Sequence, residues 1–217
     1  MNGVRTYWVS ETAGVLDVTG AITFDAQRRI WGLAEHFRSH PSVREAVPAM
    51  NNLTVELHPA APDLASLLDT LQERWHQSSA VELSSRRIEI PVEYGGAAGP
   101  DLDEVARHTG LSPAEVVRLH SAGEYTVYFL GFLPGFAYLG GLDPRLATPR
   151  RREPRLAVPA GSVGIGGEQT GVYPSSSPGG WRLIGRTALQ LFDPARNSPS
   201  LLSAGDSVRF VNAGEHF

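Results

Sequence analysis

The pattern of apolar and polar positions divides the first part of the chain into short strands and two helices. Residues 4–10, 14–18 and 87–92 alternate apolar and polar side chains, as half-buried strands do. Residues 43–47 and 53–57 are interpreted as a further pair of strands on either side of the segment 48–52. Apolar residues recur at three- and four-residue spacing after Asp25 and again after Asp63, which predicts two amphipathic helices. This order favours an α+β N-terminal domain with a split βαβ, ferredoxin-like arrangement.

A segment of small residues, 94–100, follows the last of these strands, and we interpret it as a domain boundary. Two short helices are predicted beyond it. Asp101 and Ser112 are each followed by a glutamate three residues later, which is the pattern of a capping box at a helix N-terminus. Gly110 is expected to end the first of the two helices.

The remainder of the chain consists of short apolar stretches separated by glycine and proline. The predicted strands are residues 125–130, 162–165, 171–173, 181–186, 189–192 and 207–211. Many short strands with tight turns favour a closed, mainly-β barrel over a parallel sheet. We therefore expect two domains, an α+β domain in residues 1–93 and a barrel in residues 94–217.

Composition excludes several classes of function. The net charge of −4 argues against a nucleic-acid-binding groove. The 217 residues include no cysteine and no lysine, which excludes disulfides, cysteine nucleophiles, Walker A loops and Schiff-base chemistry. No signal-peptide core and no apolar run of membrane-spanning length is present. We expect a soluble cytoplasmic protein with no membrane partner and no metal site.

Glycine, proline, aromatic residues and arginine are interleaved from Tyr125 to Trp181 at a density that a plain core does not need. This predicts an ordered, loop-rich wall around a small polar ligand. Within the arginine-rich run that follows Pro149, we favour Arg155 for an inward role, because it follows Pro154 and precedes an apolar stretch. A fixed guanidinium can bind a carboxylate or phosphate with two hydrogen bonds.

Other polar residues leave alternatives open. Gln169 and Tyr173 bracket a Thr-Gly turn and suit an amide or lactam ligand, although both are also typical of a barrel edge. His120 ends a capped helix, where it is either a structural imidazole or a group that handles protons. His36 and His40 are four residues apart, and we interpret them as a solvated helix face rather than a metal site.

Several motifs in the second half of the chain resemble the family of KipI and the 5-oxoprolinase B subunit, which is also labelled allophanate hydrolase subunit 1 or carboxyltransferase subdomain C/D. They are Gly131-Phe-Leu-Pro-Gly-Phe-Ala-Tyr-Leu, Gln169-Thr-Gly-Val-Tyr-Pro, Ser177-Pro-Gly-Gly-Trp and Gly205-Asp-Ser-Val-Arg-Phe. The chain departs from the family pattern at Gly164 and Gly166, where alanine is common.

The resemblance implies a cyclophilin-like barrel and a role in ATP-dependent 5-oxoprolinase, which converts 5-oxo-L-proline to L-glutamate. The implied partners are a C subunit (KipA-like, carboxyltransferase subdomain A/B) and a LamB/YcsF-type A subunit, with ATP bound by or shared with them. The candidate catalytic residues are His120 and Arg155. The candidate substrate-binding residues are Phe132, Pro134, Phe136, Gln169, Tyr173 and Trp181.

Two other functions remain compatible with this resemblance. One is a KipI-like regulator that inhibits autophosphorylation of a sensor histidine kinase. The other is the carboxyltransferase half of a urea-degrading system, which would need biotin on another protein. The Ser-Ser-Lys chemistry of amidase-type allophanate hydrolases is excluded, because the chain has no lysine.

Overall fold

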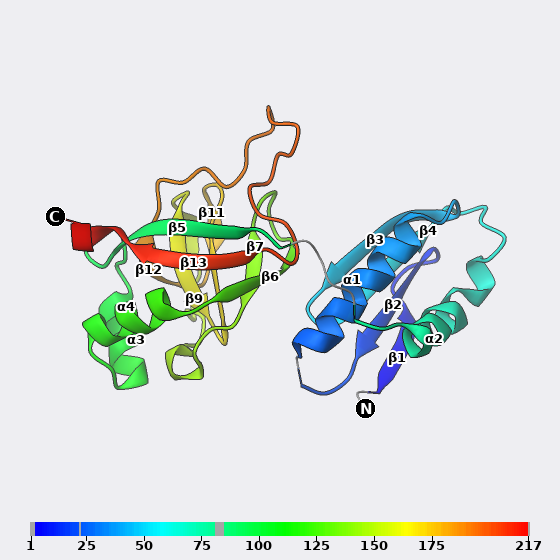
Figure 1. Cartoon of the computed structure of the whole chain (residues 1–217), viewed down its shortest axis with the longest axis horizontal. Coiled ribbons are helices and arrows are strands. Elements are labelled where there is room, and N and C mark those ends of the chain that lie inside the picture. The colour runs from blue at the N-terminus through cyan, green and yellow to red at the C-terminus, as the bar shows by residue number, and fades with distance from the viewer. Residues whose placement is uncertain (1–2, 22, 81–84, 217) are drawn as a thin grey trace. The chain divides into compact units, whose positions relative to one another are not determined.

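The computed structural model describes residues 3–21, 23–80 and 85–216, and it divides into two compact units (Figure 1). Unit 1 is Met1–Leu83 and unit 2 is Ser84–Phe217. Of the helices in the described residues, none has the length and apolar content needed to cross a membrane.

Unit 1 is an antiparallel sheet packed against two helices. Its elements are β1 (Val4–Trp8), β2 (Ala13–Val18), α1 (Phe24–Arg38), β3 (Val43–Ala49), β4 (Asn52–Leu57), the 3-10 turn η1 (Leu64–Ser66) and α2 (Leu67–Gln77). The strand order is β1-β2-β4-β3. The apolar stripes predicted from spacing form the core, since Ile30 of α1 and Leu71 of α2 are fully buried with Leu53 of β4.

The sheet differs from the predicted arrangement in one strand. Residues 87–92 were expected to complete it, but its edge strand is β1, which pairs with β2 in the register Val4↔Val18. Alternation identified the strand at 87–92 correctly. Alternation carries no information about which sheet a strand joins, because that depends on contacts with distant parts of the chain.

Unit 2 is a closed seven-stranded barrel with two helices beside it (Figure 1). Its strands are β5 (Arg87–Tyr94), β6 (Tyr125–Leu130), β7 (Ala137–Gly140), β9 (Ser162–Gly166), β10 (Gln169–Val172), β12 (Arg182–Arg186) and β13 (Ser207–Asn212). A separate ribbon pairs β8 (Arg155–Val158) with β11 (Ser177–Gly179), and the other elements are α3 (Leu102–Thr109), α4 (Pro113–Ala122), η2 (Pro144–Leu146) and η3 (Ala213–His216).

The predicted barrel is therefore confirmed, with changes in its strands. Around the barrel the order is β10-β7-β6-β13-β5-β12-β9, and β9 pairs with β10 to close it. Residues 189–192 were predicted to be a strand, but they contribute only an isolated bridge between Phe192 and Ser200. The strand β7 and the β8–β11 ribbon were not predicted, since glycine and proline hide their short apolar patterns.

The boundary between the units lies ten residues before the predicted one. Strand β5 belongs to the barrel, where it runs parallel to β13, so residues 84–93 are part of unit 2 rather than the first domain. The small residues at 94–100 form a tight connection instead of a linker. A Cβ atom on Gly99 would lie 2.0 Å from the carbonyl oxygen of Ile184, so glycine is required there for close packing.

The two helices of unit 2 begin differently. Ser112 and Glu115 form the predicted capping box at α4, with the Ser112 hydroxyl accepting from the Glu115 amide. Asp101 precedes α3 but makes no side-chain cap, so that predicted capping box is wrong. Its carboxylate is used elsewhere, in an ion pair with Arg155. Gly110 ends α3 in the left-handed conformation, as predicted (φ 71°).

Candidate functional site

A pocket of about 230 Å³ lies in unit 2. It is lined by residues from the β6–β7 loop and β7, from the segment between η2 and β8, from the start of the β10–β11 loop, and from β11 and the segment that joins it to β12. Its lining residues are Phe132, Phe136, Tyr138, Arg150, Pro154, Tyr173, Pro178, Gly179, Gly180 and Trp181. Four of the six predicted substrate-binding residues are therefore together in one cavity.

The floor of the pocket is a cluster of four aromatic rings, which we call the aromatic cluster: Phe136, Tyr138, Tyr173 and Trp181. The ring of Phe136 lies 5.0 Å from Tyr138, 5.4 Å from Tyr173 and 5.5 Å from Trp181, in edge-to-face arrangements. Such pairs contribute about 0.5–1.5 kcal/mol each beyond area burial. The pocket is thus pre-formed by rigid side chains.

Glycines of the barrel wall allow Trp181 to lie flat against it. A Cβ atom on Gly166 would lie 2.4 Å from the Trp181 Nε1 atom, and one on Gly164 would lie 3.2 Å from its Cβ atom. The absence of a side chain at these two glycines thus has a structural role. It sets the position of the indole ring, and with it the shape of the pocket floor.

Phe132 stands at the pocket mouth in a strained backbone conformation. Its φ is 68°, in a region that non-glycine residues rarely adopt, and its side chain is 60% exposed. The loop is held by hydrogen bonds from the Gly131 amide to the Phe136 carbonyl and from the Phe136 amide to the Leu133 carbonyl. Strain of this kind occurs most often at functional sites, where the surrounding structure maintains it.

Asp101 fixes the arginine loop, which we define as residues 149–155. The Asp101 carboxylate accepts hydrogen bonds from Arg155 Nη1 at 2.9 Å, from Arg155 Nη2 at 2.8 Å and from the Leu183 amide at 2.8 Å. Arg151 Nη1 is 3.4 Å away. Burial favours the neutral acid, but these hydrogen bonds and the two guanidinium charges outweigh it and lower the pKa of Asp101. The carboxylate is therefore charged and fully partnered.

This arrangement corrects the expected inward role of Arg155. Both Nη atoms of Arg155 bind Asp101, and Arg155 does not line the pocket. Arg150 lines it instead, with its Cζ atom 6.0 Å from the centre of the Trp181 ring. Among the residues that the structure describes, the Arg150 guanidinium has no carboxylate partner. The arginine that lines the pocket therefore belongs to the predicted arginine-rich run, but it is Arg150 rather than Arg155.

His120 is on α4, where it is fully buried, and it does not line the pocket. Thr170 Oγ1 donates to the Gly164 carbonyl, so it accepts from His120 Nε2–H at 2.8 Å. The other nitrogen, Nδ1, then accepts from the Tyr94 hydroxyl at 2.7 Å. Burial lowers the pKa of His120 to about 3, so the imidazole is neutral at physiological pH. Of the two predicted roles, the geometry favours the structural one.

The other two predicted substrate-binding residues lie outside the pocket. Pro134 is exposed in the β6–β7 loop. Gln169 begins β10 and pairs with Gly166 across a tight turn. In contrast, Tyr138 and Arg150 were missed, although both belong to segments that the sequence singled out. Tyr138 lies in β7 and Phe136 directly precedes that strand, so the two-residue spacing of an extended chain places both side chains on the same side.

The pocket is suited to binding rather than to covalent chemistry. Among the described residues that line it there is no serine, threonine, histidine, aspartate or glutamate side chain. Burial raises the pKa of the Tyr138 and Tyr173 hydroxyls, so both remain neutral and can exchange hydrogen bonds with a ligand. Arg150 supplies the single full charge. A small, planar, anionic molecule fits this combination.

Neither the glycine-rich stretch after Pro159 nor the pocket fits ATP. The glycine-rich stretch from Gly161 forms a barrel strand, β9, and a turn into β10, whereas a phosphate-binding loop leads into a helix. The cavity is also smaller than the ~300–1,000 Å³ typical of drug-sized ligands.

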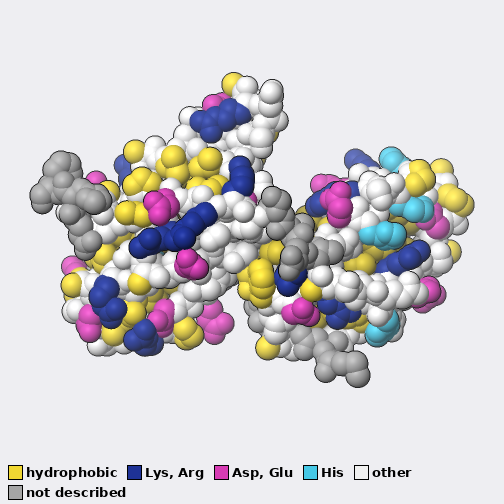
Figure 2. Space-filling model, viewed as in Figure 1, with side chains coloured by type: hydrophobic (Ala, Val, Ile, Leu, Met, Phe, Trp, Pro, Cys, Tyr) yellow, Lys and Arg dark blue, Asp and Glu magenta, His cyan; other side chains and the backbone are white. Residues whose placement is uncertain are grey.

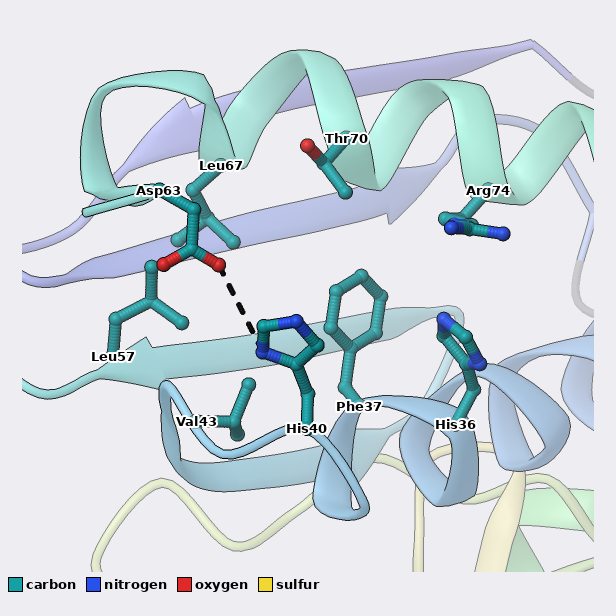
Figure 3. Close-up of a pocket in the computed structure, with 9 residues that line it drawn as sticks. All are labelled: His36, Phe37, His40, Val43, Leu57, Asp63, Leu67, Thr70 and Arg74. Carbon is teal, nitrogen blue, oxygen red and sulfur yellow. Dashed lines mark ion pairs between the residues drawn. The ribbon is translucent and has the colours of Figure 1, made fainter. Parts of the chain in front are cut away.

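A second, smaller pocket of about 70 Å³ lies in unit 1, between α1 and α2 (Figure 3). Asp63 faces His40 at one end, with 3.8 Å between Asp63 Oδ2 and His40 Nδ1, while His36 lies near Arg74 at the other. Histidines are prominent on the visible face of unit 1 (Figure 2). Within the described residues, no three His, Cys, Asp or Glu side chains converge in the way that a metal ion requires.

Comparisons with known proteins agree with one another. Residues 4–202 match the family described as carboxyltransferase domain, subdomain C and D. The chain is 58% identical to a protein of Escherichia coli O157:H7 that is named as the B subunit of 5-oxoprolinase, over 97% of both chains. It is 46% identical to the protein of the same name in Haemophilus influenzae, over 95% of this chain and 96% of that one.

A more distant structure shares the fold. The urea amidolyase of K. lactis superposes with a TM-score of 0.80 at 20% identity, over 99% of this chain and 15% of that one. At such identity the likeness concerns the fold alone. The family match and the two bacterial relatives show that this chain belongs to the carboxyltransferase subdomain C and D family, the family that includes the 5-oxoprolinase B subunits.

Proposed function

We propose that this chain is the B subunit of a 5-oxoprolinase, which is a multi-subunit hydrolase that opens the cyclic amide of 5-oxo-L-proline to give L-glutamate at the expense of ATP. The observation that carries the proposal is the 58% identity, over 97% of both chains, to a protein named for that activity. The pocket supports it, because its size and its single cation suit a small cyclic acid.

The lining of the pocket supports a division of roles between this chain and its partner subunits. An amide carbonyl is a poor electrophile, and opening it requires activation of the carbonyl and a nucleophile. The described lining residues offer aromatic rings, two phenols and one guanidinium, which bind and orient a ring. We assign substrate binding to this chain, and ATP binding and water activation to partner subunits.

The proposed partners are a C subunit of the carboxyltransferase subdomain A/B type and an A subunit of the LamB/YcsF type. We place the complex in the cytoplasm, where ATP is available. A pocket that holds a substrate but supplies no nucleophile requires a second surface to complete it, and the partner subunits would provide that surface.

Reconstitution tests the proposal. The chain is co-expressed with its two partners, and ADP and glutamate formation from 5-oxoproline are measured on the purified complex. We expect both products at equal rates, and neither product when this chain is omitted. Full activity of the two partners alone would refute the proposal. The control is a complex that carries Arg152→Gln. Arg152 is an exposed residue of the arginine loop that does not line the pocket, so this complex should retain activity.

A second candidate is carboxyl transfer, which the family description favours. Such a reaction needs a carboxylated biotin from another protein, because this chain has no lysine to carry biotin. A biotinylated protein that co-purifies with the complex on a streptavidin blot, together with bicarbonate-dependent ATP hydrolysis, would support it. ATP hydrolysis that depends on 5-oxoproline and not on bicarbonate would exclude it.

A further inference from the structure

Three of the four arginines in the arginine loop can be distinguished by what their guanidinium groups contact. Arg151 and Arg155 both point to Asp101, whose side chain is 4% exposed. Arg150 points into the pocket instead, and among the described residues it has no carboxylate within ion-pair distance. Of these three guanidinium groups, only that of Arg150 lines the pocket, and the position of its backbone is set by its neighbours.

The backbone on both sides of Arg150 is anchored. The Pro149 carbonyl accepts a hydrogen bond from Arg182 Nε at 3.3 Å, and Arg182 is itself paired with Glu104 at 2.6 Å. On the other side, the Arg151 amide donates to the Gly180 carbonyl at 2.7 Å. Because the backbone is already anchored, ligand binding has to order the Arg150 side chain but not the loop, which lowers the entropic cost of binding.

The guanidinium lies beside an aromatic surface. Its Cζ atom is 6.0 Å from the centre of the Trp181 ring, within the range of a cation–π contact. A planar ligand at the floor of the pocket would contact the rings of Trp181 and Phe136, while an anionic group on that ligand would reach the cation. Two hydrogen bonds from one guanidinium to one carboxylate give direction as well as affinity.

We infer that Arg150 is the residue that selects for a carboxylate on the substrate ring, with Trp181 as the surface against which the ring lies. This inference rests on the proposed function, and it makes that function more specific. The pocket would bind 5-oxoproline and other small cyclic carboxylates, and it would reject 2-pyrrolidinone, the same lactam without its carboxylate.

Trp181 offers a direct measurement. It is the one tryptophan of residues 84–217, whereas the other three lie in unit 1. The chain is labelled with 5-fluorotryptophan, and the Trp181 resonance is assigned by Trp181→Phe. 5-Oxo-L-proline and 2-pyrrolidinone are then titrated into the chain alone and into the complex with its partners, while the ¹⁹F shift of Trp181 is followed.

We expect 5-oxoproline to move the Trp181 resonance in a saturable manner and 2-pyrrolidinone to leave it unchanged. Arg150→Gln should weaken 5-oxoproline binding at least tenfold and raise KM more than it lowers kcat. Arg150→Lys, which keeps the charge, should restore part of the affinity. Arg152→Gln, an exposed arginine two positions away, should bind like the parent chain.

Several outcomes would overturn the inference. They are equal binding of the two lactams, parent-like affinity in Arg150→Gln, and a Trp181 resonance that no carboxylate moves in either preparation. Failure of the proposed function looks different. In that case the complex does not hydrolyse 5-oxoproline, yet small cyclic carboxylates still shift Trp181 in a manner that depends on Arg150.

Discussion

Asp101→Asn is the change that tests most directly how the pocket is held together. The substitution keeps the size of the side chain and removes its charge. It also replaces one acceptor oxygen with an NH₂ group. In either orientation of the amide, this NH₂ group faces an N–H donor of Arg155 or Leu183. One carboxylate oxygen is 2.8 Å from the Leu183 amide and 2.9 Å from Arg155 Nη1, and the other is 2.8 Å from Arg155 Nη2.

The expected loss follows from these contacts. Hydrogen bonds to a charged group contribute about 1.5–3 kcal/mol each, and breaking a buried ion pair costs about 3–5 kcal/mol. The side chains of Arg155 and Arg151 are 24% and 31% exposed, so water recovers part of that loss. We expect the free energy of unfolding of unit 2 to fall by about 2–4 kcal/mol.

The assay is urea unfolding at pH 7, with the ¹⁹F signal of Trp181 as the probe. Because this tryptophan is the one in unit 2, its signal reports the barrel separately from unit 1. The matched control is Glu89→Gln, which removes a carboxylate from an exposed pair 3.9 Å from Arg209. Exposed pairs of this kind contribute roughly 0–1 kcal/mol.

The pH dependence provides a second check. The pKa of Asp101 is lowered in the folded protein, so the ion pair stabilises the fold above the ordinary aspartate pKa of about 3.9. That contribution is lost as the pH falls through the lowered pKa. The difference between parent and variant should be constant from pH 7 to about 5 and shrink in stronger acid. A difference within about 0.5 kcal/mol at pH 7, or one that grows on acidification, would refute the reasoning.

Two further predictions concern the barrel wall and its buried histidine. Gly166→Ala should lower the free energy of unfolding of unit 2 by about 1–3 kcal/mol in urea and move the Trp181 resonance, because the new Cβ atom would lie 2.4 Å from the indole. The control is Gly131→Ala, where the nearest atom to the new Cβ is 3.6 Å away, and it should cause neither change. Between pH 6.5 and about 3, the His120 side chain of the unfolded parent chain binds a proton that the buried imidazole does not bind. The free energy of unfolding of His120→Gln should therefore depend less on pH in this range than that of the parent, by up to ~1.4 kcal/mol per pH unit. Identical slopes of unfolding free energy against pH for parent and variant would contradict a buried neutral imidazole. Activity per folded molecule should be unchanged in His120→Gln, since His120 does not line the pocket.

Features that depend on short-range pattern were predictable from the sequence. Strands such as β6 and β9 were located because apolar alternation and bounding glycines act within a few residues. The capping box at Ser112 was correct for the same reason. The aromatic wall was also visible, because aromatic residues concentrated beside glycine and proline mark a surface that has to be both rigid and concave.

Features that depend on distant contacts were not predictable. The membership of β5 in the barrel requires its pairing with β13, which is far along the chain. The capping role expected of Asp101 fails because Arg155, 54 residues away, binds its carboxylate. The difference between Arg150 and Arg155 has the same origin, since the distant Asp101 carboxylate binds Arg155 while Arg150 lines the pocket.

The pairing of the arginines also limits what this chain can contribute to a lactam-opening reaction. A guanidinium that binds the substrate carboxylate through two of its N–H donors has its charge largely neutralised by that carboxylate, so it contributes little to stabilising negative charge on the lactam oxygen. Arg155 and Arg151 are held by Asp101, and the phenols of the pocket are neutral. With Arg150 bound to the carboxylate, any further positive charge that stabilises the developing oxyanion has to come from a partner protein. The proposed division between binding here and activation on a partner therefore follows from counting the charges at the pocket.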